Sequence, residues 1–137
     1  MANRVLIVDD DEIVRAVHER DLQRWGYVVA SAADAAEAVS MARAFRPDLI
    51  LMDRMLPDAD GVALAARMAR ELADHPPRVL VVSGSYDEER SGDGSVVRYL
   101  PKGIDRQRLR RLVAAALAGE RLSCIPPVSP AGGAGRG

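Results

Sequence analysis

Short runs of apolar residues recur along the chain and predict the strands of a sheet. The four strongest runs are apolar throughout instead of alternating with polar residues, as in strands that are covered on both faces. They occupy residues 5–8, 27–30, 49–52 and 79–82, and residues 96–100 form a weaker fifth run. All five runs are as long as ordinary strands, so the pattern predicts a sheet inside the molecule.

Segments with helical spacing of apolar residues lie between these runs. They cover residues 13–25, 35–45, 62–72 and 109–117. Acidic residues that can cap a helix precede the first segment, Gly26 follows it, and Asp105 is a candidate cap for the last. Strands that alternate with helices imply a doubly wound parallel sheet, because right-handed crossovers place helices on both of its faces. We therefore expect an α/β fold.

Composition narrows the class of protein. A chain of 137 residues is long enough for one domain with one core. Its 19 basic and 20 acidic residues nearly balance, so no overall field attracts nucleic acid or an anionic membrane. No apolar segment approaches the roughly 18 residues that span a bilayer, and the single cysteine, Cys124, cannot form an internal disulfide. We expect a cytoplasmic protein that binds neither membranes nor nucleic acid.

The C-terminal region has a different composition from the rest of the chain. Residues 122–137 are rich in proline, glycine and alanine and lack a hydrophobic pattern. Such a segment cannot bury enough apolar surface to fold. We expect one domain over residues 1–121, followed by a disordered tail.

Polar side chains follow four of the five predicted strands. Asp9 and Asp10 follow the first strand, Asp53 the third, Ser83 the fourth and Lys102 the fifth. In an open parallel sheet, ligands bind beyond the carboxyl ends of the strands. We therefore expect these five residues to meet at one edge of the sheet.

Each of these residues also has a structural explanation when it is considered alone. Asp9 and Asp10 could cap a helix, Asp53 could begin a turn, and Ser83 could belong to an ordinary loop. Lys102, however, is the only lysine among the 19 basic residues. An ammonium is a compact point charge, whereas a guanidinium is a wide planar fork, so a narrow anion site favours lysine. The joint placement of the five residues therefore favours a functional site.

The residue types in this set suggest phosphoryl chemistry. Three carboxylates that converge repel one another, and Mg²⁺ resolves the conflict because it takes one or two carboxylates and keeps positions for water and phosphate. Asp9 and Asp10 can hold the metal, which leaves the Asp53 carboxylate to act as the nucleophile. Lys102 and the Ser83 hydroxyl can contact the phosphoryl oxygens.

Four segments occur together in this chain: Val-Leu-Ile-Val-Asp-Asp at residues 5–10, Pro-Asp-Leu-Ile-Leu-Met-Asp at 47–53 with Met-Leu-Pro at 55–57 and Gly61, Val-Val-Ser-Gly at 81–84, and Tyr-Leu-Pro-Lys at 99–102. With these segments the chain resembles the response-regulator receiver domain of two-component signalling, which is CheY-like in fold. The resemblance spans about residues 3–120. It implies five strands in the order 2-1-3-4-5.

The resemblance also implies a role for each matching residue. Asp53 would accept a phosphoryl group from a phosphohistidine and would itself be a Mg²⁺ ligand. Asp10 would bind the metal directly, Asp9 through water, and the Met55 backbone carbonyl would be a further ligand. Lys102 would contact the phosphoryl group.

A conformational switch is implied as well. Ser83 would move to hydrogen-bond the phosphate, and the ring of Tyr99 would then turn inward, so that a local charge event changes the surface that partners bind. The partners would be a sensor histidine kinase or histidine phosphotransfer protein, and an unidentified downstream protein. The protein would catalyse only its own phosphorylation and dephosphorylation, and would not be an enzyme acting on other substrates.

The sequence departs from the family pattern in three respects. Gly103 stands after Lys102 where the family usually has a cis-proline, and only 18 residues separate Ser83 from Lys102. The missing length predicts a shortened or irregular fourth helix, since residues 91–95 read as a loop. No further domain follows, so we expect a stand-alone receiver.

Two other functions are compatible with the same fold. A pseudo-receiver would bind partners without phosphorylation, and the departures around Gly103 favour it, whereas the complete acidic set argues against it. A Mg²⁺-dependent phosphohydrolase with Asp53 as its nucleophile usually has a second carboxylate two residues later. Met55 occupies that position here, which makes the hydrolase the weaker alternative.

Overall fold

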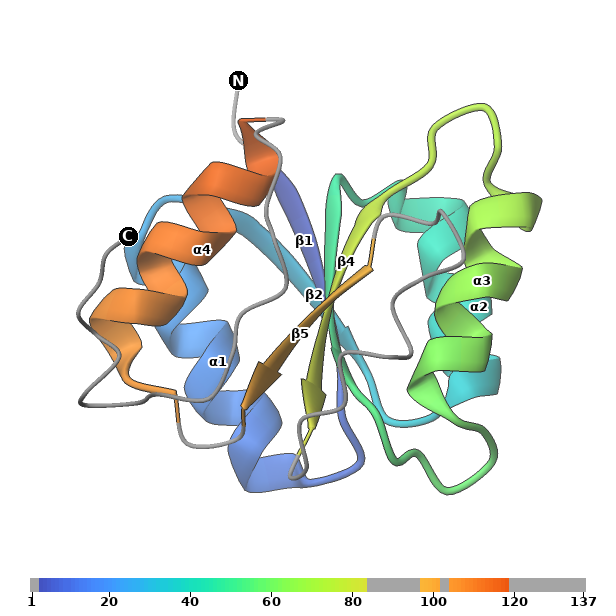
Figure 1. Ribbon diagram of the computed structural model, residues 1–137, viewed down its shortest axis with the longest axis horizontal. Helices are drawn as coiled ribbons and strands as arrows, with labels where there is room; N and C mark the ends of the chain where they lie inside the picture. The colour runs from blue at the N-terminus through green and yellow to red at the C-terminus, as the bar shows by residue number, and fades with distance from the viewer. Residues whose placement is uncertain (1–2, 84–96, 102–103, 119–137) are drawn as a thin grey trace, which may run out of the picture.

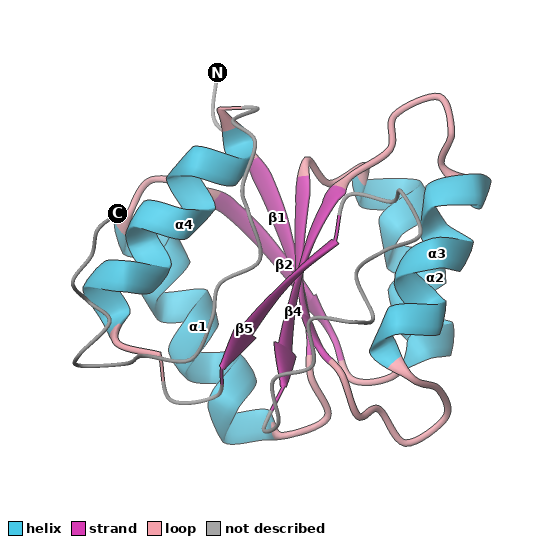
Figure 2. Ribbon diagram, in the orientation of Figure 1, coloured by secondary structure: helices cyan, strands magenta, loops and turns pink. Residues whose placement is uncertain are grey.

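The computed structural model describes residues 3–83, 97–101 and 104–118 and shows an α/β fold with helices on both faces of a sheet (Figures 1 and 2). In chain order the elements are β1 (Arg4–Val8), α1 (Glu12–Arg24), β2 (Val28–Ala32), α2 (Ala35–Phe45), β3 (Leu49–Asp53), α3 (Gly61–Glu71), β4 (Arg78–Ser83), β5 (Val97–Pro101) and α4 (Arg106–Leu117). The strands lie in the order β2-β1-β3-β4-β5, and every neighbouring pair is parallel. The predicted α/β class is confirmed.

Two hydrophobic clusters hold the layers together, one on each face of the sheet. Alternate residues of a strand point to opposite faces. Thus Leu6 and Ile50 pack in the cluster beneath α2 and α3, whereas Ile7 and Leu51 pack in the cluster beneath α1 and α4. This arrangement accounts for the continuous apolar runs in the central strands, since both faces are covered.

The strand β2 differs from the sequence-based expectation. It lies at one edge of the sheet, and only Ala32 at its end is fully buried. The strand also begins one residue later than predicted, because the Tyr27 amide donates to the Leu22 carbonyl at the end of α1 (3.1 Å). The expectation that every strong run is covered on both faces is therefore wrong for β2.

An aspartate caps the N-terminus of each of the four described helices. Asp11 caps α1, Asp34 caps α2, Asp60 caps α3 and Asp105 caps α4, each through a side-chain oxygen that accepts backbone amides of the first turn. The predicted cap at Asp105 is confirmed. The acidic run after β1 is thus divided, with Asp11 serving the helix and the residues before it lying at the end of the strand.

Some predicted features lie outside the described residues. These are the irregular helix expected between β4 and β5, Gly103, and the tail at residues 122–137. Within the part of the chain that the structure describes, no helix has the length and apolar character needed to cross a bilayer.

Candidate functional site

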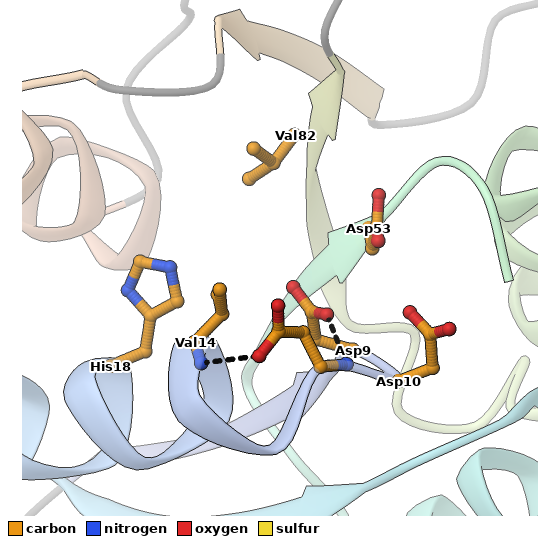
Figure 3. A pocket seen from close by; sticks show the side chains of 7 residues that line it. Asp9, Asp10, Val14, His18, Asp53 and Val82 are labelled. Carbon is orange, nitrogen blue, oxygen red and sulfur yellow. Dashed lines mark hydrogen bonds between the residues drawn. The ribbon is translucent and has the colours of Figure 1, made fainter.

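The parallel sheet brings Asp9, Asp10 and Asp53 together at the carboxyl ends of its strands. β1 ends at Val8, so the first two aspartates follow it directly, and Asp53 is the last residue of the neighbouring strand β3. In each of the three side chains one carboxylate oxygen lies within 4.8 Å of the corresponding oxygens of the other two. Figure 3 shows the three carboxylates around one space. The predicted meeting of these three residues is confirmed.

Backbone contacts fix the position of Asp9. Its amide donates to the Ala32 carbonyl of β2 (3.1 Å), which continues the sheet ladder by one bond. Its Oδ1 accepts the Asp11 amide (2.8 Å), and its own carbonyl accepts a hydrogen bond from the Arg15 guanidinium (2.8 Å). Asp9 is therefore held both by the sheet and by the first turn of α1, and the residue is 9% exposed.

Asp53 is equally well fixed. The residue is 5% exposed, and its Oδ1 accepts the Met55 amide (3.2 Å). The next amide, of Arg54, donates to the Val82 carbonyl of β4 (3.0 Å). Asp53, the acceptor candidate, thus lies at the end of β3, where the backbone continues to hydrogen-bond with β4.

The three carboxylates open into a cleft of about 240 Å³. Its lining includes the three aspartates, together with Asp11, Val14, His18 and Val82. Asp10 is exposed, whereas Asp9 and Asp53 are buried. Carboxylate oxygens at these separations repel one another, and a hard divalent cation with oxygen preference offsets that repulsion. The donor set therefore fits Mg²⁺, with Asp10 on the side open to solvent.

The remaining predicted residues differ in how far they can be placed. Ser83 is the last residue of β4 and pairs with Pro101, and Tyr99 lies within β5 opposite Val81. Lys102 lies outside the described residues, as do the side chains of Ser83 and Tyr99. Chain position alone places Lys102 directly after the last residue of β5.

Met55 follows Asp53 by two residues and begins a hairpin turn. The residue is 72% exposed, and its backbone forms an isolated antiparallel bridge with Asp60. Because its amide binds Asp53, the Met55 peptide is fixed next to the acidic cluster. The hydrolase alternative usually has a carboxylate at this position, and the thioether of Met55 cannot act as one.

The sequence places His18 on a helix with no candidate ligand beside it, which predicts a solvated side chain, but in the structure His18 is half-buried. It lies one turn after Val14 on α1, and its ring faces the cleft (Figure 3). Its Nδ1 is buried and has no hydrogen-bond partner among the residues that the structure describes. Burial lowers the pKa of His18 below the usual value of 6.5, and the nearby Asp21 carboxylate offsets part of that shift. Helical spacing from Val14 was the one signal in the sequence that pointed to this position.

The chain matches the family model described as the response regulator receiver domain over residues 5–114. Among curated proteins, it is 35% identical to the response regulator MprA of Mycobacterium ulcerans over 123 residues, which is 89% of this chain and 53% of that protein. It is 36% identical to MprA of Mycobacterium bovis over 118 residues, 85% of this chain and 51% of that protein. The chain thus spans about half the length of the curated relatives that it matches.

Solved structures give the same family. A CheY-like receiver domain protein from Methanospirillum hungatei superposes with a TM-score of 0.78 at 26% identity, covering 87% of this chain and 96% of that one. A putative response regulator from Chloroflexus aurantiacus superposes with a TM-score of 0.77 at 30% identity, covering 86% and 99%. With the acidic cluster at the carboxyl edge of its parallel sheet, this chain belongs to the response regulator receiver domain family of two-component systems.

Proposed function

We propose that this receiver domain accepts a phosphoryl group on Asp53 in a Mg²⁺-dependent reaction, and that the modification changes which partner it binds. One observation carries the proposal. Asp53 is a buried, positioned carboxylate whose oxygen lies within 4.8 Å of those of Asp9 and Asp10, at a cleft that opens beside an exposed carboxylate.

The reaction needs an accessible nucleophile and a donor. A carboxylate oxygen of Asp53 attacks the phosphorus of a phosphorylated imidazole on the donor protein. An O–P bond forms as the N–P bond breaks, and the bonding electron pair stays on the imidazole nitrogen. The product is an aspartyl phosphate and a neutral donor histidine once that nitrogen or its ring partner is protonated.

The surrounding residues of the chain position these groups. The Met55 amide donates to Oδ1 of Asp53 and so orients its carboxylate. Asp9 and Asp10, with the Met55 carbonyl, would hold the metal. Mg²⁺ supplies positive charge next to the phosphoryl oxygens when it is bound. Lys102 and Ser83 would contact those oxygens from the ends of β5 and β4, and Tyr99 would report the change at the surface.

Further parts of the proposal concern the setting of the reaction. The donor would be a sensor histidine kinase or a histidine phosphotransfer protein, and the output would be binding to an unidentified protein partner. We expect a cytoplasmic protein that acts on no other substrate and binds neither nucleic acid nor membrane. Residues 1–121 would form the receiver, with residues 122–137 as a tail.

Intact mass spectrometry tests the proposal. Incubation with acetyl phosphate and Mg²⁺ should add one phosphoryl group, and either chelation of the metal or the substitution Asp53→Asn should prevent it. Asp48→Asn is a matched control, because Asp48 directly precedes β3, at the end opposite Asp53, and binds the Arg4 amide and His75. An unmodified wild-type chain, in conditions that label a known receiver, would favour the pseudo-receiver. Sustained turnover of a phosphate ester would favour the hydrolase.

A further inference from the structure

The carboxylate of Asp58 binds the N-terminus of a helix to which it is not adjacent in sequence. Its Oδ1 accepts the Ala35 amide (2.8 Å) and its Oδ2 accepts the Ala36 amide (3.2 Å), both in the first turn of α2. We call these two hydrogen bonds the Asp58 tether. Sequence alone indicates only a turn residue at this position, so the tether is a property of the fold.

The tether complements the helix's own cap and does not duplicate it. Asp34 accepts the Glu37 amide (2.8 Å), and the Glu37 carboxylate accepts the Ala33 amide in return (2.8 Å). These contacts resemble a capping box, although Glu37 binds the amide of Ala33, the residue before the cap. They leave the amides of Ala35 and Ala36 without an acceptor in the first turn. Asp58 supplies that acceptor from another loop, and its negative charge also suits the positive end of the helix dipole. In agreement with these contacts, the pKa of Asp58 is lowered: the Ala35 amide has the largest effect, burial opposes it, and the Ala36 amide lowers the pKa further.

Asp58 stands at the tip of the hairpin turn that follows β3. The Leu56 amide donates to the Ala59 carbonyl (3.1 Å), and Met55 pairs with Asp60, so Pro57 and Asp58 form the tip. At the base, the Gly61 amide donates to the Arg54 carbonyl (2.6 Å). The hairpin is therefore fixed at its base to β3 and α3, and at its tip to α2.

The segment between these two fixed points contains the Met55 peptide, whose amide binds Asp53. The helix that receives the tip begins three residues after Ala32, and the Ala32 carbonyl accepts the Asp9 amide. The tether thus joins the loop after β3, which contains Met55, to the chain segment that binds Asp9. The tether therefore links the positions of the two loops that carry the acidic residues.

We propose that Asp58 is a positioning residue for the acidic site: by holding the hairpin tip on α2, it fixes the Met55 peptide next to Asp53, Asp9 and Asp10 and so raises the affinity of the site for Mg²⁺. This inference rests on the proposed function, in which the Met55 carbonyl is a metal ligand. Asp58 itself is not one of the three carboxylates of the acidic cluster. Its effect is to keep the hairpin in one conformation before the metal binds, so that binding does not have to order it.

The test compares Asp58→Ala with Asp34→Ala in the full chain. Both variants remove hydrogen bonds to the first turn of α2, but the second leaves the tether in place. Phosphorylation by acetyl phosphate is followed as a function of Mg²⁺ concentration. We expect Asp58→Ala to raise the half-saturating Mg²⁺ concentration by about three- to tenfold with little change in the rate at saturating Mg²⁺, which is the effect of losing one or two hydrogen bonds that order the site. Asp34→Ala should leave the half-saturating concentration close to that of the wild type.

A conservative variant separates positioning from loss of fold. Asp58→Asn keeps one oxygen that can accept the Ala35 amide, but its amide nitrogen cannot accept the second hydrogen bond. It should restore part of the Mg²⁺ affinity, and it remains informative if the alanine variant unfolds. A half-saturating concentration that is equal in the wild type and both Asp58 variants would overturn the inference.

Hydrogen exchange without metal gives a second, independent readout. In Asp58→Ala the amides of Ala35, Ala36 and Leu56 should exchange faster, whereas in Asp34→Ala the Leu56 amide should keep its protection. Unchanged exchange at Leu56 in Asp58→Ala would show that the tether does not order the hairpin, and this result would hold whether or not the chain is phosphorylated. If instead the tether is present by exchange and the wild type is never labelled, the proposed function fails and the metal-positioning role fails with it.

Discussion

Gly61 lies against the backbone of Asp53 so closely that a Cβ atom on Gly61 would stand 2.5 Å from the Asp53 carbonyl oxygen. The same atom would stand 2.9 Å from the Arg54 Cα. Because both neighbours are backbone atoms, they cannot move aside without moving the strand end that carries the acidic site. Gly61, the first residue of α3, thus helps to position Asp53.

The substitution Gly61→Ala should therefore affect both stability and phosphorylation. We expect a loss of about 1–3 kcal/mol in the free energy of unfolding, as for other overpacked sites, measured by urea denaturation. We also expect slower labelling by acetyl phosphate at saturating Mg²⁺, because the Asp53 backbone must shift.

Gly26→Ala is the matched control for that experiment. Gly26 has a φ of +97° with no atom within 4 Å of a Cβ position, so its cost comes from backbone strain alone. It should lose stability without any change in labelling rate. Equal labelling rates in both glycine variants would show that Gly61 has no influence on the site.

The acidic cluster predicts an unusual effect of removing a charge. In metal-free protein, Asp10→Asn should raise the unfolding temperature by about 2–4 °C, because it relieves repulsion among three carboxylates. Added Mg²⁺ should stabilise the wild type more than the variant, since a ligand that binds only the folded state stabilises it.

Glu12→Gln provides the comparison. Glu12 lies in the first turn of α1, outside the cluster, where its charge favours the helix dipole. Its removal should leave the unfolding temperature unchanged or lower it slightly, and should not alter the response to Mg²⁺. If Asp10→Asn lowers the unfolding temperature as well, the carboxylates do not repel one another as proposed.

The main features of this site follow from local sequence. The continuous apolar runs locate the strands, and the residue after or at the end of each run can then be assigned to the carboxyl edge. That reasoning places Asp9, Asp10 and Asp53 together, as observed. It also finds the Asp105 cap, because capping depends only on neighbours within one turn.

Contacts between distant segments could not be obtained in this way. Asp58 lies 23 residues from the Ala35 amide that it binds, and Asp21 lies 85 residues from Arg106. The partial burial of His18 could not be predicted, because it depends on which elements surround α1, not on α1 itself. Exposure of β2 depends on its place at the edge of the sheet, which local apolar character does not reveal.

The ion pair between Asp21 and Arg106 is expected to be structural. Asp21 is 8% exposed at its side chain and lies 2.9 Å from the Arg106 guanidinium, which is 64% exposed. Arg106→Gln should cost about 1–3 kcal/mol in urea denaturation, since it leaves a buried carboxylate without its charged partner. The exposed Arg111 on the same helix gives a control, as Arg111→Gln should have a much smaller effect.

A double substitution completes this comparison. Asp21→Asn together with Arg106→Gln should recover part of the lost stability, because no unpaired charge is then buried. Additive losses in the two single variants would contradict a direct interaction. Labelling by acetyl phosphate should be unchanged in the single Arg106 variant.

His18 predicts a specific dependence of stability on pH. Its pKa is lower in the folded state than in the unfolded chain, chiefly because of burial, so the unfolded state binds the proton more readily. This contribution to stability is complete above the unfolded pKa and is lost as the pH falls from about 7 through the folded pKa. Between about pH 7.5 and about pH 5.5, the wild type should therefore lose more stability than His18→Gln. Parallel pH profiles from chemical denaturation would contradict the assignment to His18. His75 is present in both proteins, so it cannot account for a difference between their profiles.

Location of the modified residue tests the central claim most directly. An aspartyl phosphate is an acyl phosphate, and borohydride reduces its acyl carbon to an alcohol, which turns the modified aspartate into homoserine and releases phosphate. After treatment with acetyl phosphate and Mg²⁺, then borohydride, peptide mass spectrometry should find homoserine at residue 53 and unaltered aspartate at residues 9 and 10. Homoserine at residue 9 or 10, or at no residue in a chain that has gained phosphate, would contradict Asp53 as the acceptor.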